Sequence, residues 1–230
     1  MALLRRAMFP ALLLLLAARH AVAEPRVYLS WNAPWGSPRA RSFIVPDCAD
    51  TTHDDTLYVC FDPGRDTTLV GVTAQLWFRP GDKDTLGHAW HFDDHSVPRL
   101  RAHFGDQPAC GALTPWGGLG AGGARYHSLT DAGALRMIWA VAANQVAHVD
   151  SGRVYLFARV MVPRPRDPSE CRRSLCIEWS SSLISFGGRG AVQAASVARS
   201  VAWNSAGGAA CAGAGDNPLL KPWTPPQHKR

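Results

Sequence analysis

The chain has 230 residues, with 24 Lys and Arg, 18 Asp and Glu, and a formal net charge of +6. Three of the basic residues lie before residue 20 and three in the last ten positions, so residues 24–220 carry no net charge. Such a body lacks the basic surface typical of nucleic-acid-binding proteins, and we set that class aside.

A secretory signal peptide is predicted over residues 1–23. Arg5 and Arg6 precede an apolar stretch over 8–18, and Ala21-Val22-Ala23 has the small-x-small pattern of a cleavage site. The stretch is shorter than the roughly 20 residues that a membrane-spanning helix needs. We therefore expect cleavage after Ala23 and a secreted, extracellular, surface or periplasmic chain without a transmembrane span. An uncleaved N-terminal anchor is the alternative.

Residues 24–205 are predicted to form a single all-β domain. Short runs rich in β-branched and aromatic residues, bounded by Gly, Pro and Asp, predict nine strands, at 27–30, 42–45, 56–61, 69–78, 87–92, 135–142, 154–162, 176–186 and 196–203. This pattern favours an antiparallel β-sandwich of jelly-roll or immunoglobulin-like type. Residues 206–230, rich in Ala, Gly and Pro, are expected to form a C-terminal tail.

Alternation of side chains within two of these runs predicts which face of each strand is buried. Val70, Val72, Ala74, Leu76 and Phe78 share one face of the run at 69–78. In the run at 56–61, the three apolar residues at 57, 59 and 61 also share a face. We expect these faces to point into the core.

Six cysteines in an exported chain predict three disulfides, among 15 connectivities that the sequence does not resolve. Cys171 and Cys176 are the pair we expect first, because the segment CRRSLC can close a small turn before a strand. A zinc site would need two close Cys pairs or a Cys pair with a His pair, whereas only this one close Cys pair exists and its spacing is loose. The remaining cysteines, also expected to be oxidised, are Cys48, Cys60, Cys110 and Cys211.

From about residue 55 to 204 the order of segments resembles that of cohesin-like secreted bacterial β-sandwiches. DTLYVCFDPGRDTTLVGVTAQLWFRPGD is similar to the opening of that family, and LRMIWAVAANQVAHVDSGRVYLFARVMV to its later hairpin. The resemblance implies a nine-stranded jelly-roll-like fold that binds a protein partner. Related carbohydrate-binding modules bind polysaccharide, so both kinds of partner follow from it.

A cluster of histidines and aspartates is the main candidate for metal chemistry. On a strand, His91, Asp93 and His95 would share one face and His88 would point to the other. Imidazole and carboxylate are common ligands of transition metals. The segment therefore makes a metal-dependent hydrolase one alternative function.

Aspartates in turns are the candidates for calcium, which would be the cofactor if the protein has one. Asp82 and Asp84 lie in GDKDTLG, and Asp62 and Asp66 flank the turn FDPGRD. Calcium takes six to eight oxygen ligands, whereas aspartates in turns more often accept hydrogen bonds from the backbone. We favour the second interpretation.

Motifs of known catalytic classes are not found, which favours a non-catalytic protein. A Gly-x-Ser-x-Gly elbow is lacking. Glu178 lies within a predicted strand and has no second carboxylate to work with, as glycoside hydrolysis would require. We expect its side chain to face solvent.

Tryptophans in loops are the candidate ligand-binding residues. Trp35 and Trp116 lie in Pro- and Gly-rich segments, where an exposed indole can stack on a sugar ring or anchor a protein. The alternative is that both pack over an open end of the sandwich. The sequence thus favours a secreted, non-catalytic module that binds protein or polysaccharide. A structural component of an extracellular assembly, without a separable ligand, is its rival.

Overall fold

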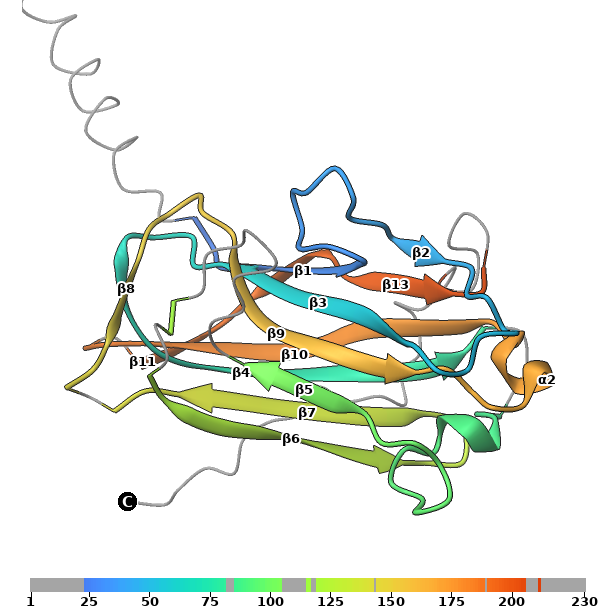
Figure 1. Cartoon of the computed structure of the whole chain (residues 1–230). Helices are drawn as coiled ribbons and strands as arrows, with labels where there is room; N and C mark the ends of the chain where they lie inside the picture. Colours follow the sequence, from blue (N-terminus) through green and yellow to red (C-terminus); the bar gives the residue numbers. More distant parts are fainter. Residues whose placement is uncertain are drawn as a thin grey trace, which may run out of the picture.

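The computed structural model describes residues 23–81, 85–104, 115–116, 119–142, 144–188, 190–205 and 211. Within them the fold is all-β, as predicted, with two sheets packed face to face (Figure 1). The predicted signal peptide up to residue 22 and the tail apart from Cys211 lie outside the described residues, as do Asp82, Asp84 and Cys110. Among the described residues, no helix is long and apolar enough to span a membrane.

The first sheet has five strands. In spatial order they are β12 (Ala195–Ala198), β1 (Arg26–Trp31), β3 (Asp54–Asp62), β9 (Tyr155–Pro163) and β5 (Arg101–Phe104). All neighbours are antiparallel except β12 and β1, which pair in parallel. The two short parallel pairs of the fold, this one and β2 with β13, are a departure from the purely antiparallel arrangement predicted.

The second sheet has eight strands. Six follow in the order β2 (Phe43–Ile44), β13 (Ser200–Trp203), β10 (Leu175–Phe186), β4 (Thr67–Pro80), β7 (Gly133–Ala140) and β6 (Ala121–Ser128). Two short strands complete it, β11 (Gly190–Gln193) beside β10 and β8 (Ala147–Val149) beside β4. The long strands β4 and β10 form the middle of this sheet, and Figure 1 shows them behind β3, β9 and β5.

The core fills the space between the two sheets and follows the predicted alternation. Val72, Ala74, Leu76 and Phe78 of β4 all point into it. Leu69 joins them where Val70 was expected, because the pairing of β4 with β10 shifts register between Ser185 and Phe186. A bulge of this kind moves the following side chains to the other face. The apolar face of β3 also lies in the core, as predicted.

The strand predicted at 87–92 is wrong. The segment contains a 3₁₀ turn, η2 (His88–Trp90), in which the amide of Trp90 donates to the carbonyl of Gly87. Trp90 points into the core and contacts Trp203, with ring centroids 5.1 Å apart. Burial of this indole at the end of the sandwich, rather than a local β-propensity, sets the backbone here.

Two disulfides join described residues, and they overturn the predicted pair Cys171–Cys176. The bonds are Cys48–Cys171 and Cys176–Cys211. Cys171 ends the short helix α2 (Pro168–Cys171) and points into the core. Cys176 lies on β10 between two core-facing residues, so strand alternation directs it to the outer face of the sheet. Short sequence spacing therefore did not bring the two sulfurs together. Oxidation of Cys60 and Cys110 stays a prediction.

Candidate functional site

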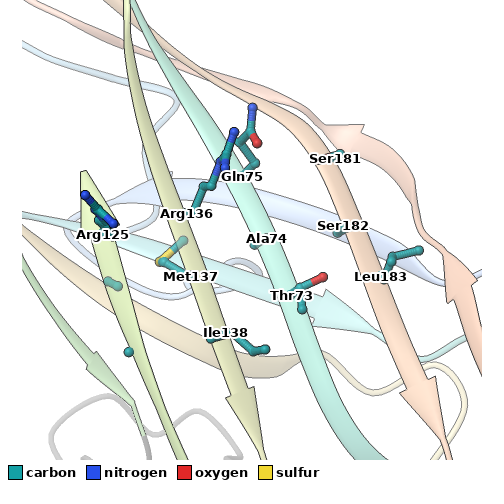
Figure 2. A pocket seen from close by; sticks show the side chains of 12 residues that line it. Thr73, Ala74, Gln75, Arg125, Arg136, Met137, Ile138, Ser181, Ser182 and Leu183 are labelled. Atoms are coloured by element: carbon teal, nitrogen blue, oxygen red, sulfur yellow. The ribbon is translucent and has the colours of Figure 1, made fainter. Parts of the chain in front are cut away.

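A groove of about 360 Å³ lies on the outer face of the eight-stranded sheet (Figure 2). Strands β6, β7, β4 and β10 form its floor. The side chains that line the groove include charged, polar and apolar ones. The lining residues used below are Thr73, Gln75, Gly123, Arg125, Arg136, Ile138, Ser181 and Leu183.

Strand register arranges the outward side chains in two rows that cross the strands. The first row runs Ser181, Gln75, Arg136, Arg125 from β10 to β6. The next row runs Leu183, Thr73, Ile138, Gly123 over the same four strands. Neighbouring strands lie about 4.8 Å apart, so each row spans about 14 Å. The groove is thus a polar row beside a more apolar one.

Arg125 and Arg136 are direct cross-strand neighbours, and both are exposed. No acidic group of the described part of the chain forms an ion pair with either guanidinium. Like charges placed directly opposite each other destabilise a sheet. This pair therefore lowers the stability of the fold and leaves two sets of donors without an anion.

Gln75 lies next to Arg136 and is only 3% exposed. Its Oε1 atom accepts no hydrogen bond from any described residue. Leaving a buried polar atom without a partner costs about 1–3 kcal/mol. Figure 2 shows Gln75, Arg136 and Arg125 on three neighbouring strands of the floor. Unused hydrogen-bonding capacity thus converges at one place.

The second row supplies an apolar surface at the same place. Ile138 is 52% exposed, and Leu183 and Thr73 lie beside it in the row. Gly123 completes the row on β6, and a Cβ built there would meet no atom within 4 Å. The open space above Gly123 is therefore room for a ligand.

Glu178 does not face solvent, contrary to our expectation. It points outward from β10 but is completely buried beside Trp77, one row from the groove. Its carboxylate oxygens lie 3.0 Å from Arg79 Nη2 and 2.7 Å from Arg199 Nε. These are close ion pairs rather than aligned hydrogen bonds. Burial therefore outweighs the two arginines and raises the pKa of Glu178 above its ordinary value.

This raised pKa predicts how Glu178→Gln changes stability with pH. The folded-state pKa of Glu178 lies above the unfolded value of about 4.5. The protonated carboxyl group therefore stabilises the folded state, and this contribution to stability is complete below that pH. The contribution is then lost as the pH rises through the folded pKa. We expect the glutamine variant to match the native protein near pH 4 and to exceed its stability at pH 7. Urea unfolding at a series of pH values measures this. A variant that becomes relatively less stable towards pH 7 would show that the arginines lower the pKa instead.

The candidate metal ligands are not brought together. His91 Nε2 lies 3.4 Å from the carbonyl oxygen of Leu86, and His95 Nδ1 lies 3.0 Å from Arg99 Nη2. Asp93 accepts hydrogen bonds from the amide and hydroxyl of Ser128. Among the described residues, no group of three His, Cys, Asp or Glu side chains has the arrangement of a metal site. The loop conformation of this segment, which is not a strand, removes the common face that the prediction required.

Two of the candidate calcium ligands serve the backbone. Asp62 Oδ1 accepts hydrogen bonds from the amides of Gly64 and Gly152, at 2.8 and 3.3 Å. Asp66 Oδ1 accepts one from the amide of Ser151, at 2.6 Å. Both side chains thus hold two neighbouring turns against each other, in agreement with the interpretation we favoured.

The two candidate tryptophans have different environments. Trp116 is buried and packs beside Trp139, with ring centroids 6.3 Å apart, so its predicted role as an exposed stacking residue is wrong. It covers the core instead, as the alternative interpretation held. Trp35 is 37% exposed and stacks on Tyr28, with centroids 5.3 Å and planes 19° apart. Its indole remains a candidate contact surface, on the five-stranded sheet.

The groove residues were not among those singled out from the sequence. One sequence pattern did indicate part of the groove, because the alternation in the run at 69–78 places Thr73 and Gln75 on the outward face. Arg125 could not be found this way, since it follows Gly122, Gly123 and Ala124 in a segment where no strand was predicted. No protein-family model matches the chain, and no curated protein sequence is significantly similar to it. The cohesin-like resemblance thus stays a prediction.

Proposed function

We propose that this protein is a secreted, non-catalytic binding module and that its ligand binds in the groove on the outer face of the eight-stranded sheet. The observation that carries the proposal is the buried amide oxygen of Gln75, which accepts no hydrogen bond from a described residue, beside the guanidinium groups of Arg125 and Arg136, which form no ion pair with a described acidic group. Donors, acceptors and the exposed side chain of Ile138 lie together on one floor. Such a surface is suited to holding a ligand by contact.

The shape of the floor supports binding of an extended ligand rather than a compact one. The two rows cross four strands, because the floor of the groove is the sheet itself. A linear chain laid along a row would meet one side chain from each strand in turn. Both kinds of partner expected from the sequence, protein and polysaccharide, present linear segments of this kind.

Filling the groove tests the proposal. Gly123→Phe places a ring above β6, where a new side chain meets no neighbouring atom, so the fold should keep its thermal stability. Candidate polysaccharides and secreted proteins of the producing cell would be screened with the full chain, and the affinity of each ligand measured by calorimetry. We expect the variant to bind at least about tenfold more weakly, which corresponds to about 1.4 kcal/mol. Unchanged affinity for every ligand found would overturn the groove as the binding site.

Trp35 is a second candidate contact surface, favoured by its exposed indole stacked on Tyr28. Stacked aromatic rings present a flat apolar face of the kind that sugars bind. Calorimetry on Trp35→Ala, beside the groove variant, decides between the two surfaces. A tenfold loss, about 1.4 kcal/mol, in Trp35→Ala with full binding by Gly123→Phe would place the site on the five-stranded sheet.

A further inference from the structure

We infer that the ligand of the groove is a linear polysaccharide that carries carboxylate groups. The inference rests on the proposed function and names the class of its ligand. Three features carry it: the charge of the outer face, the unused hydrogen-bonding atoms of its floor, and the direction in which the rows run.

The described outer face around the groove is positively charged although the body of the chain is neutral. Arg79, Arg125, Arg136 and Arg199 lie on or beside it, whereas Glu178 forms ion pairs with two of them and Asp131 interacts electrostatically with Arg79. The remaining two guanidinium groups project from adjacent strands at the groove. An arginine binds a carboxylate through two parallel N–H···O bonds, which gives geometric selectivity as well as charge. Charge complementarity therefore requires an anionic ligand.

The uncharged polar side chains of the groove call for hydroxyl groups on the ligand, close to its carboxylate. Gln75 Oε1 is an acceptor that needs a donor, and it lies one strand from Arg136, about 4.8 Å away in the sheet. Thr73 and Ser181 add hydroxyls that both donate and accept. An acidic sugar carries a carboxylate and several hydroxyls on one ring. A polypeptide of acidic residues offers the charge but few hydroxyls, and a nucleic acid would be expected to stack on aromatic residues, which the described lining lacks.

The direction of the rows explains why this ligand would lie across the strands. A peptide that adds to a sheet pairs with the backbone of an edge strand and runs along it. The groove instead presents side chains from four strands in sequence, with a polar row beside Ile138 and Leu183. The hydroxyl edge of a sugar chain would face the polar row, and the C–H face of its rings would lie on the apolar row.

The test uses polygalacturonate as the probe, with its fully methyl-esterified form as the matched neutral polymer. We expect the native full chain to bind the acid form, to bind the ester at least about tenfold more weakly, and to lose affinity as salt rises. Arg125→Ala with Arg136→Ala should show the same tenfold loss for the acid form. The matched control is Arg26→Ala with Arg39→Ala, which removes two exposed charges away from the groove and should bind normally.

A third variant keeps the inference testable if the arginine pair affects folding. Gln75→Leu removes the amide oxygen that has no partner among the described residues, so stability should be unchanged or higher while affinity for polygalacturonate falls by about threefold or more. Equal affinity for poly-L-glutamate or oligothymidylate would overturn the inference, because charge alone would then explain binding. Binding of a neutral ligand that Gly123→Phe abolishes would also overturn it, yet would leave the proposed function intact.

Discussion

Replacing Cys48 and Cys171 together by alanine is expected to lower the free energy of unfolding by about 4–5 kcal/mol. The bond joins residues 123 positions apart, so its loss frees a long loop of the unfolded chain. The chain-entropy relation gives about 5 kcal/mol for this separation and about 4 kcal/mol for a separation of 35 residues. The second value applies to Cys176–Cys211. Urea unfolding followed by tryptophan fluorescence measures both losses.

The control for this prediction is the pair Cys176→Ala with Cys211→Ala, expected to be less destabilising by about 1 kcal/mol. A bond between Cys171 and Cys176 would close a loop so short that its loss should cost only about 2 kcal/mol by the same relation. Peptide mapping of the unreduced protein distinguishes the two connectivities directly. Recovery of a peptide that links Cys171 to Cys176 would contradict the structure and the larger value with it.

Elements with strong local signals were predicted well from the sequence. The run at 69–78 alternates over nearly its whole length, and it forms the long central strand β4 with the predicted face inward. β6 was missed because its first four residues, Ala121 to Ala124, contain only Ala and Gly. Eight consecutive pairs with β7 make it a strand, and that partner is not visible in the local sequence. Propensity predicts a strand only where side chains, rather than a neighbour, decide the conformation.

The candidate site depended on information that a linear pattern does not contain. Arg125 and Arg136 are separated by a turn in the chain, and only the register of β6 against β7 makes them neighbours. Glu178 was expected in solvent because its strand position alternates with apolar residues. Alternation predicted its face correctly, but the residues that bury it on that face, Trp77, Arg79 and Arg199, come from β4 and from between β12 and β13. The zero net charge of residues 24–220 likewise gave no sign of the arginines gathered on the outer face of the eight-stranded sheet.

Trp203→Ala is expected to lower the free energy of unfolding by about 4 kcal/mol, the cost typical of removing a buried indole. Trp203 is fully buried and contacts Trp31 and Trp90, with ring centroids 5.9 and 5.1 Å away. Its Nε1 donates a hydrogen bond of 3.0 Å to the carbonyl oxygen of Cys171. The residue thus ties β13 to η2 and to the end of α2, and its removal leaves a cavity between them. Thermal and urea unfolding of the variant measure the loss.

Two further variants separate packing from hydrogen bonding at Trp203. Trp203→Phe keeps most of the ring contacts but leaves the buried carbonyl of Cys171 without its donor, so we expect a loss of about 2 kcal/mol. Trp35→Ala is the matched control, because the same side chain at an exposed site should cost no more than about 1 kcal/mol through its stacking on Tyr28. If Trp203→Ala were as mild as Trp35→Ala, the aromatic cluster at this end of the sandwich would not be the packed core described. The groove would then rest on a less rigid sheet, because β13 pairs with the strand β10 that carries Ser181 and Leu183.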